Sequence, residues 1–282
     1  MTATSLNTET PAPATSRRGW GRIATAASFA ILPILLLLGW HWYATTHPSQ
    51  LASPIDVAVQ LWRWIGLGEL GLGSYYEASW PETIGASLAR VLIGFLIASV
   101  LGIIVGMVIG LSKVGARVFD PTVQVLRPIP MTAWLPLSIA FFGLTNSASI
   151  FLIALGAFYP VVVNTTTGVR RVNIGLIRAA QVLGASRGKV LLRVIVPAAL
   201  PSIFDGLRVA LGLSWMLVIL AEMFAVRTGL GFVLWTAFGV QRTATMMSAM
   251  ITIGVVGFLC DRLLVWVRGR LLGWSVGQTV GV

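Results

Sequence analysis

The 282-residue chain is 56% hydrophobic and only 10% charged, which excludes an ordinary soluble domain, because such domains carry about 25% charged residues. Its 20 Lys and Arg outnumber its 9 Asp and Glu, for a net charge of +11. These cations form clusters between long apolar runs, as the positive-inside rule of membrane proteins requires, rather than the dense basic patch typical of a nucleic-acid-binding protein. We therefore expect no nucleic-acid partner, and one cysteine with two histidines predicts neither an internal disulfide nor a metal site.

The first predicted element is a transmembrane helix over residues 17–43. Its apolar stretch, Ile23–Tyr43, is longer than the roughly 7–15 apolar residues of a signal peptide and meets the roughly 20 needed to cross a bilayer. Residues 1–16 are mostly small and polar, so we expect them to form a disordered cytosolic tail.

Residues 44–82 are predicted to form an external loop with interfacial helices. Aromatic residues are frequent in it, and aromatic side chains suit the membrane–water interface, although ordinary packing explains them equally well. These residues are Trp62, Trp64, Tyr75, Tyr76 and Trp80.

Further apolar segments are each long enough to cross a membrane, which brings the predicted number of spans to six. They are Thr83–Leu111, Val123–Phe142, Ala148–Gly168, Ala199–Phe224 and Ala244–Val267. Together they make up a core over residues 83–268, followed by a cytosolic tail at 269–282. We therefore expect an all-α integral membrane protein with six transmembrane helices.

The distribution of cations predicts the orientation of these spans. When the N-terminus is placed in the cytosol, the clusters at 113–117, 170–193 and 262–270 also face the cytosol, and only Arg63, Arg227 and Arg242 lie outside. This asymmetry predicts that both termini are cytosolic.

Small residues recur every four positions in the second predicted span, at Ala98, Gly102, Gly106 and Gly110. Such spacing lines them along one helix face and lets a second helix approach closely. We interpret it as a packing seam.

The segment 170–201 predicts a cytosolic elbow of two short helices. The first, Ile174–Leu183, stops at Gly184, which readily takes the left-handed conformation found just past a helix end. Ser186 is expected to cap the second helix with its side chain, and Pro197 to end it. The elbow presents basic side chains that suit a groove on a soluble partner, namely Arg187, Lys189 and Arg193.

This elbow resembles the cytosolic loop of ATP-binding-cassette (ABC) importer permeases, which reads Glu-Ala-Ala, three residues, Gly, nine residues, Ile-x-Leu-Pro. Here Ala179-Ala180, Gly184 and Val194-Ile195-Val196-Pro197 keep that spacing, and Arg178 replaces the Glu. The resemblance implies that the following residues couple the chain to an ATPase: Ile177, Arg178, Ala179, Ala180, Gly184, Ala185, Ser186, Arg187 and Lys189.

Other motifs resemble the nitrate, sulfonate, taurine and bicarbonate branch of these permeases. They are Arg127-Pro128-Ile129-Pro130, Trp134-Leu135-Pro136-Leu137, Pro160–Thr165, Gly206-Leu207-Arg208 and Gly229-Leu230-Gly231. The resemblance implies a type I ABC importer permease fold in the bacterial cytoplasmic (inner) membrane. It also implies a homodimer on two cytosolic ATPase subunits, which bind ATP and Mg, and an external solute-binding protein. This chain itself is expected to bind no cofactor and to have no enzymatic site.

Charged residues at membrane depth need a partner or a water-filled path. Asp205 and Arg208, three positions apart on one helix, are expected to neutralise each other. Arg127 precedes two prolines that open the backbone, which favours a pathway wall that attracts an oxyanion, although a cation that reaches back to the membrane interface is the simpler alternative. The candidate pathway residues are Arg127, Met131, Trp134, Asn164, Trp215 and Glu222; Glu222 is interpreted as a scaffold or gate residue.

These features together predict a transport subunit that forms the path of a small solute, with an oxyanion such as nitrate, a sulfonate, taurine or bicarbonate as the expected cargo. The alternative is an ion-coupled secondary transporter or channel. A self-sufficient carrier has no use for a basic elbow in the cytosol, and would instead show matched broken helices at mid-membrane.

Overall fold

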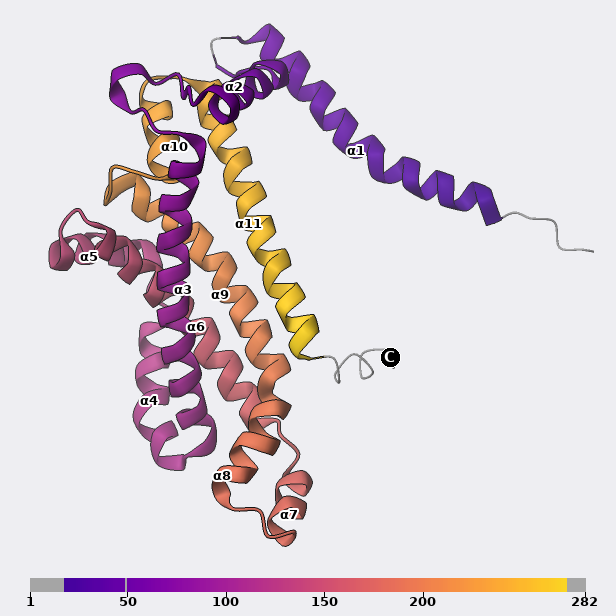
Figure 1. Ribbon diagram of the computed structural model, residues 1–282, viewed down its shortest axis with the longest axis vertical. Helices are drawn as coiled ribbons and strands as arrows, with labels where there is room; N and C mark the ends of the chain where they lie inside the picture. Colours follow the sequence, from indigo (N-terminus) through magenta and orange to yellow (C-terminus); the bar gives the residue numbers. More distant parts are fainter. Residues whose placement is uncertain (1–17, 49, 273–282) are drawn as a thin grey trace, which may run out of the picture. The chain divides into compact units, whose positions relative to one another are not determined.

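The computed structural model describes residues 18–48 and 50–272 (Figure 1), all of whose regular structure is helical. The predicted tail at 1–16 lies outside the described residues, as does most of the tail predicted at 269–282. The chain divides into two compact units, residues 1–55 and 56–282. The first unit contains helix α1 (Arg18–Thr46), which corresponds to the predicted first span, and the Trp40 indole N–H donates to the carbonyl oxygen of Ala52 at 3.0 Å.

The second unit carries the remaining helices, and α2 (Pro54–Leu67) begins at its border. They continue with η1 (Gly73–Tyr75), α3 (Trp80–Leu111), α4 (Lys113–Leu126), η2 (Met131–Ala133), α5 (Trp134–Phe142), α6 (Asn146–Arg170), α7 (Ile174–Val182), α8 (Arg187–Val190), η3 (Leu191–Ile195), α9 (Val196–Phe224), α10 (Leu230–Gly239) and α11 (Thr243–Leu271). The predicted all-α fold is confirmed for the described residues.

The centre of this unit is α6, which packs along α3 on one side and α9 on the other. The predicted seam of small residues on α3 makes the first of these contacts possible. A Cβ atom added at Gly106 would lie 2.6 Å from Cβ of Thr165, and one added at Gly102 would lie 2.8 Å from Cβ of Val161. Both distances are far below van der Waals contact, so the helices approach this closely only because glycine has no side chain.

The third predicted span, Val123–Phe142, is not one helix. Its residues lie in α4 and α5, which are bent by 84° relative to each other. Pro128 and Pro130 lack backbone donors, and Pro130 has a non-helical ψ of 131°, so the helix is interrupted and the chain turns here. Helix α4 begins well before the predicted boundary, because the Ser112 hydroxyl accepts a hydrogen bond from Gly115 N–H at 3.1 Å.

The elbow's second helix does not end before Pro197, as the sequence analysis expected. Helix α8 runs through the π-helical turn η3 into α9, and the whole stretch Arg187–Phe224 is one long helical element. In η3 the Val196 N–H donates to Leu191 O, five residues back. Pro197 therefore lies inside a continuous helical element, directly after the π-helical turn that shifts the hydrogen-bond register.

The predicted number of six spans is not exactly confirmed. Among the residues that the structure describes, four helical elements are long and apolar enough to cross a membrane, and the bent α4–α5 pair makes a fifth if it counts as one span. They are Trp80–Leu111, Asn146–Arg170, Arg187–Phe224 and Thr243–Leu271. The described apolar part of α1, Ile31–Thr46, is shorter than a full span.

The predicted loop 44–82 contains α2 and η1, and its aromatic residues divide into two groups. Trp62 and Tyr75 are exposed, as an interfacial position requires. Trp64 is 1% exposed and its indole N–H donates to Ala78 O at 3.2 Å. Trp80 donates its indole N–H to the Thr252 hydroxyl on α11 at 3.3 Å, so these two tryptophans contribute to the packed interior.

Candidate coupling and translocation sites

The elbow is a well-defined turn between α7 and α8. The Asn173 side chain caps α7 by accepting from Gly175 N–H at 2.8 Å. At the other end Gly184 adopts φ +80°, as predicted. Its N–H donates to Gln181 O, and the N–H of Ala185 donates to Ala180 O, each at 3.0 Å. This is the Schellman pattern, in which the left-handed glycine closes the helix end.

The predicted cap of α8 forms differently. Ser186 has the extended backbone of an N-cap residue, but its hydroxyl accepts no hydrogen bond from the helix. Its carbonyl oxygen accepts from Val190 N–H at 2.9 Å instead. Ser186 therefore starts the helix through its backbone alone.

The elbow has one buried side and one exposed side. Ile177, Ala180 and Ala185 pack against a core cluster that includes Val190 and Ile195. On the other side, the tip residues Val182 and Leu183 are 88% and 86% exposed. The remaining predicted coupling residues, Arg178, Ala179, Gly184, Ser186, Arg187 and Lys189, are exposed as well. The elbow thus displays two large apolar side chains among cations at the end of α9 that lies far from α10 (Figure 1).

A groove of about 460 Å³ lies between the α4–η2 turn, α6 and α9. We call it the Arg127 groove. It brings together three predicted pathway residues, Arg127, Met131 and Asn164, with α9 contributing Val209 and Leu213. The break at Pro128 and Pro130 lies in its wall, in agreement with the rule that irregular backbone at membrane depth lines a cavity or lies within protein.

The other three predicted pathway residues do not line this groove. Trp215 is buried in the main hydrophobic core, and half-buried Trp134 packs against the same core. Glu222 is fully buried. Their spacing on the helices turns them away from the groove and into the bundle.

The predicted pairing of Asp205 with Arg208 is wrong, because both residues bind partners on α11. Arg208 makes a bidentate contact with Asp261, at 2.7 and 2.9 Å. Asp205 lies 2.9 Å from Arg268. Three positions on one helix place two side chains on a shared face, but α11 offers partners straight across from that face.

Glu222 is held by a buried network that the sequence analysis did not identify. Its Oε1 accepts from Arg90 Nη1 at 2.6 Å. Its Oε2 accepts from the Ser87 hydroxyl and from Gly231 N–H, each at 2.9 Å. Gly229 adopts φ +107°, and a side chain there would collide with the Glu222 carboxyl group. The Gly229-Leu230-Gly231 motif is therefore a cradle for a buried carboxylate.

Arg90 extends this network to α6 and to the loop after α9. Its Nε donates to Asn146 Oδ1 at 2.8 Å, its Nη1 also donates to Thr228 O at 3.0 Å, and its Nη2 donates to the Thr228 hydroxyl oxygen at 2.5 Å. The sequence did contain a signal for the Arg90–Glu222 pair. Arg90 is the one charged residue in the predicted span 83–111, and Glu222 is the one charged residue between 209 and 226.

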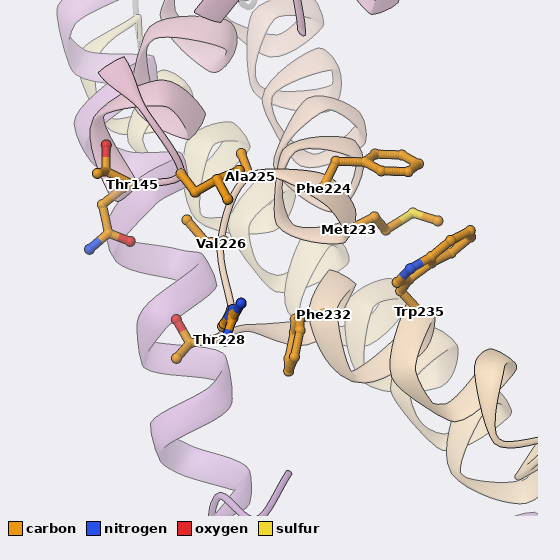
Figure 2. Close-up of a pocket in the computed structure, with 11 residues that line it drawn as sticks. Thr145, Met223, Phe224, Ala225, Val226, Thr228, Phe232 and Trp235 are labelled. Atoms are coloured by element: carbon orange, nitrogen blue, oxygen red, sulfur yellow. The ribbon is translucent and has the colours of Figure 1, made fainter. Parts of the chain in front are cut away.

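Beside this network lies a second cavity, of about 660 Å³, which we call the Arg227 pocket (Figure 2). It is formed by the start of α6, the end of α9, the loop at 225–229 and α10. Thr145 and Thr228 lie on one side of it, and Met223 and Trp235 lie on the other (Figure 2).

Comparisons with known proteins agree with this architecture. The chain is similar to the nitrate import permease protein NrtB of Leptolyngbya laminosa, at 34% identity over 89% of this chain and 88% of the relative. It is 35% identical to the bicarbonate transport system permease protein CmpB of Synechococcus elongatus, over 86% and 89% of the two chains. It is also 35% identical to the taurine transport system permease protein TauC of Escherichia coli, over 88% and 89%.

The fold resembles a chain of the MetNI methionine ABC transporter in an inward facing conformation. The TM-score is 0.57 at 18% identity, over 66% of this chain and 93% of the other. The family model described as the binding-protein-dependent transport system inner membrane component matches residues 98–272. The chain therefore belongs to this family of membrane-spanning ABC transporter permeases, which are transport subunits rather than enzymes.

Proposed function

We propose that two copies of this chain form the translocation pathway of an ABC importer for a small oxyanion, such as nitrate, bicarbonate or a sulfonate like taurine. An external solute-binding protein delivers the solute, and two cytosolic ATPase subunits bind ATP with Mg and drive the transport. The names of the relatives support this class of solute. The guanidinium of Arg127 in the groove supports it too, because a guanidinium offers both charge and planar hydrogen bonding to an oxyanion.

The orientation is part of the proposal. Both termini and the elbow face the cytosol, in accordance with the positive-inside rule. The start of α6, the end of α9 and the Arg227 pocket then face the opposite, external side.

The observation that carries the coupling role is the exposed tip of the elbow. Val182 and Leu183 project almost fully from the protein. Large apolar side chains that are exposed in a cluster mark a surface that binds another protein. The cations Arg178, Arg187 and Lys189 surround them and favour an ATPase groove with an acidic rim.

The path of the force follows from the continuity of the chain. Helix α8 passes through η3 into α9 without a break, and α9 supplies Val209 and Leu213 to the Arg127 groove. When the ATPase subunits close on ATP, they displace the elbow and tilt α9. This changes the groove wall and switches the cavity from outside-open to inside-open.

Assembly with the ATPase tests the elbow assignment. We expect the Val182→Asp/Leu183→Asp double variant to lose co-purification of the ATPase subunits, because two carboxylates replace the apolar tip. Leu67→Asp, at an exposed leucine of α2, is the matched control and should retain them. Normal co-purification with the double variant would contradict the assignment.

Cross-linking in native membranes tests the homodimer. The homodimer is refuted if only monomers form at expression levels that support transport.

A further inference from the structure

The Arg227 pocket is lined by one charged side chain, and that side chain is a cation. The nearest carboxylate in the described network is Glu222, which is fully buried and already accepts from Arg90, Ser87 and Gly231. The pocket therefore combines a positive charge with walls that carry no carboxylate.

Arg90 determines which hydrogen-bonding groups remain available in this pocket. Asn146 and Thr228, which both line it, are each able to donate and to accept hydrogen bonds. Arg90 donates to Asn146 Oδ1 and to the Thr228 hydroxyl oxygen. Since Arg90 already occupies one acceptor position on each oxygen, the Asn146 NH₂ and the Thr228 hydroxyl proton are the donors that these two side chains offer to a ligand. The Thr145 hydroxyl adds none, since it donates to Phe142 O at 2.9 Å.

A ligand matched to one cation and a set of donors is an anion that only accepts hydrogen bonds. Nitrate, bicarbonate and sulfonate groups all present several acceptor oxygens on a delocalised negative charge. A guanidinium is well suited to such groups because its planar fork donates two parallel hydrogen bonds.

One face of α9 links this pocket to the Arg127 groove. Val209 and Leu213 line the groove, and Met223 lines the pocket. Met216 lies between them and is 68% exposed. The spacings of four, three and seven residues place all four side chains on the same face of the helix. Both cavities therefore lie along one face of α9, on which Val209 and Met216 are exposed and Leu213 and Met223 are half-buried.

We propose that the Arg227 pocket is a receiving subsite for the oxyanion. Arg227 supplies the charge, while Asn146 and Thr228 supply oriented donors before the anion moves along α9 to the Arg127 groove. The proposal rests on the proposed function, since it assumes an oxyanion as cargo and an external position for the pocket.

The sharpest test is Asn146→Asp. This change keeps the acceptor oxygen that Arg90 holds, and a carboxylate in the first turn of α6 suits the helix dipole, so the protein should fold and insert normally. It replaces the NH₂ donor with a negative oxygen that repels an oxyanion. We expect uptake of the transported oxyanion by the reconstituted complex to fall at least tenfold. Asn146→Ala removes the NH₂ donor and the acceptor of Arg90 Nε but adds no negative charge, so it should lower uptake only about threefold.

Arg227→Met and Arg227→Lys provide the second arm. The first should lower uptake about tenfold and the second less, because lysine keeps the charge but not the fork. Arg242→Met removes another cation that the same topology places outside and that lines a different cavity, and it should leave both uptake and the basal ATPase rate unchanged. Uptake is measured in proteoliposomes with saturating binding protein, and the amount of inserted permease is quantified for each variant.

The outcomes separate the two proposals. If the wild type takes up nitrate, bicarbonate or taurine while Asn146→Asp and Arg227→Met do so at the wild-type rate, the subsite is refuted and the proposed function stands. If the wild type takes up none of these anions but a neutral solute, both proposals fall. Equal losses in Asn146→Ala and Asn146→Asp would also overturn the subsite, because charge repulsion is the difference that the proposal predicts.

Discussion

Arg90 and Glu222 lie 132 residues apart in the sequence, and their side chains meet at 2.6 Å. The two side chains are 6% and 0% exposed, so they form a buried ion pair that joins α3 to the end of α9. Because every oxygen of the carboxylate and every nitrogen of the guanidinium has a partner, the pair meets the condition under which a buried charge pair is tolerated.

Removing one member of this pair should destabilise the protein strongly. Arg90→Met leaves the Glu222 carboxylate buried without its counter-charge, at a cost of about 3–5 kcal/mol. The double variant Arg90→Met/Glu222→Gln should recover part of this loss, because no uncompensated charge remains. Thermal unfolding of the purified permease measures both, and strictly additive losses would contradict a direct pairing.

The glycine cradle predicts a position-specific effect of one methyl group. Gly229→Ala places a Cβ against the Glu222 carboxyl group on a backbone with φ +107°, and the strain should cost about 1–3 kcal/mol. Gly239→Ala adds the same methyl group where nothing lies within 4 Å. The control variant should unfold at the wild-type temperature, and equal stability of the two variants would rule out the cradle.

The elbow turn should be sensitive to conformation alone. A Cβ at Gly184 meets nothing in this chain within 4 Å, so within the permease Gly184→Val acts through the left-handed φ of +80°, which a β-branched residue disfavours. We expect lower substrate-stimulated ATPase activity and lower transport, with membrane insertion intact.

The matched control for this variant is Gly188→Val, which adds the same side chain in open space within the helical backbone of α8. It should leave coupling unchanged. If both variants couple like the wild type, the turn does not transmit the motion of the ATPase.

Arg127 is predicted to assist the anion in the groove. Arg127→Met should lower the uptake rate at saturating binding protein about tenfold, which corresponds to about 1.4 kcal/mol, and Arg127→Lys should retain part of the activity. Arg117→Met removes an exposed cation of α4 that does not line the groove and serves as the control. If Arg127→Met takes up the anion at the wild-type rate, Arg127 does not assist the anion and only anchors the helix at the membrane interface.

Local signals in the sequence predicted the parts of the structure that depend on neighbouring residues. The left-handed Gly184 and the α3 seam both follow from glycine chemistry and helical spacing, and both are confirmed. Helical periodicity up to Gly184 likewise placed α7 to within one residue, and Ser186 marked the start of α8, although the end of that second helix was not predicted correctly. The break at Pro128 was recognised as an opening of the helix, but its 84° bend depends on how α5 packs, which spacing alone does not encode.

Pairings between distant helices were the part that sequence reasoning missed. Asp205 and Arg208 satisfy a local rule, yet Arg268 and Asp261 of α11 are their partners, because tertiary packing sets α11 beside α9. Pro197 was expected to stop a helix, but the π-helical turn before it shifts the hydrogen-bond register. A tertiary arrangement in the first case, and a shifted backbone register in the second, prevails over a rule derived from a few neighbouring residues.

The central claim is that this permease moves a small oxyanion with energy from ATP. Its most direct test is uptake of labelled nitrate, bicarbonate and taurine into proteoliposomes that contain the permease, its ATPase subunits and its binding protein. The account predicts uptake of at least one of these anions that requires both ATP and the binding protein. Uptake driven by an ion gradient in the absence of ATP would contradict it.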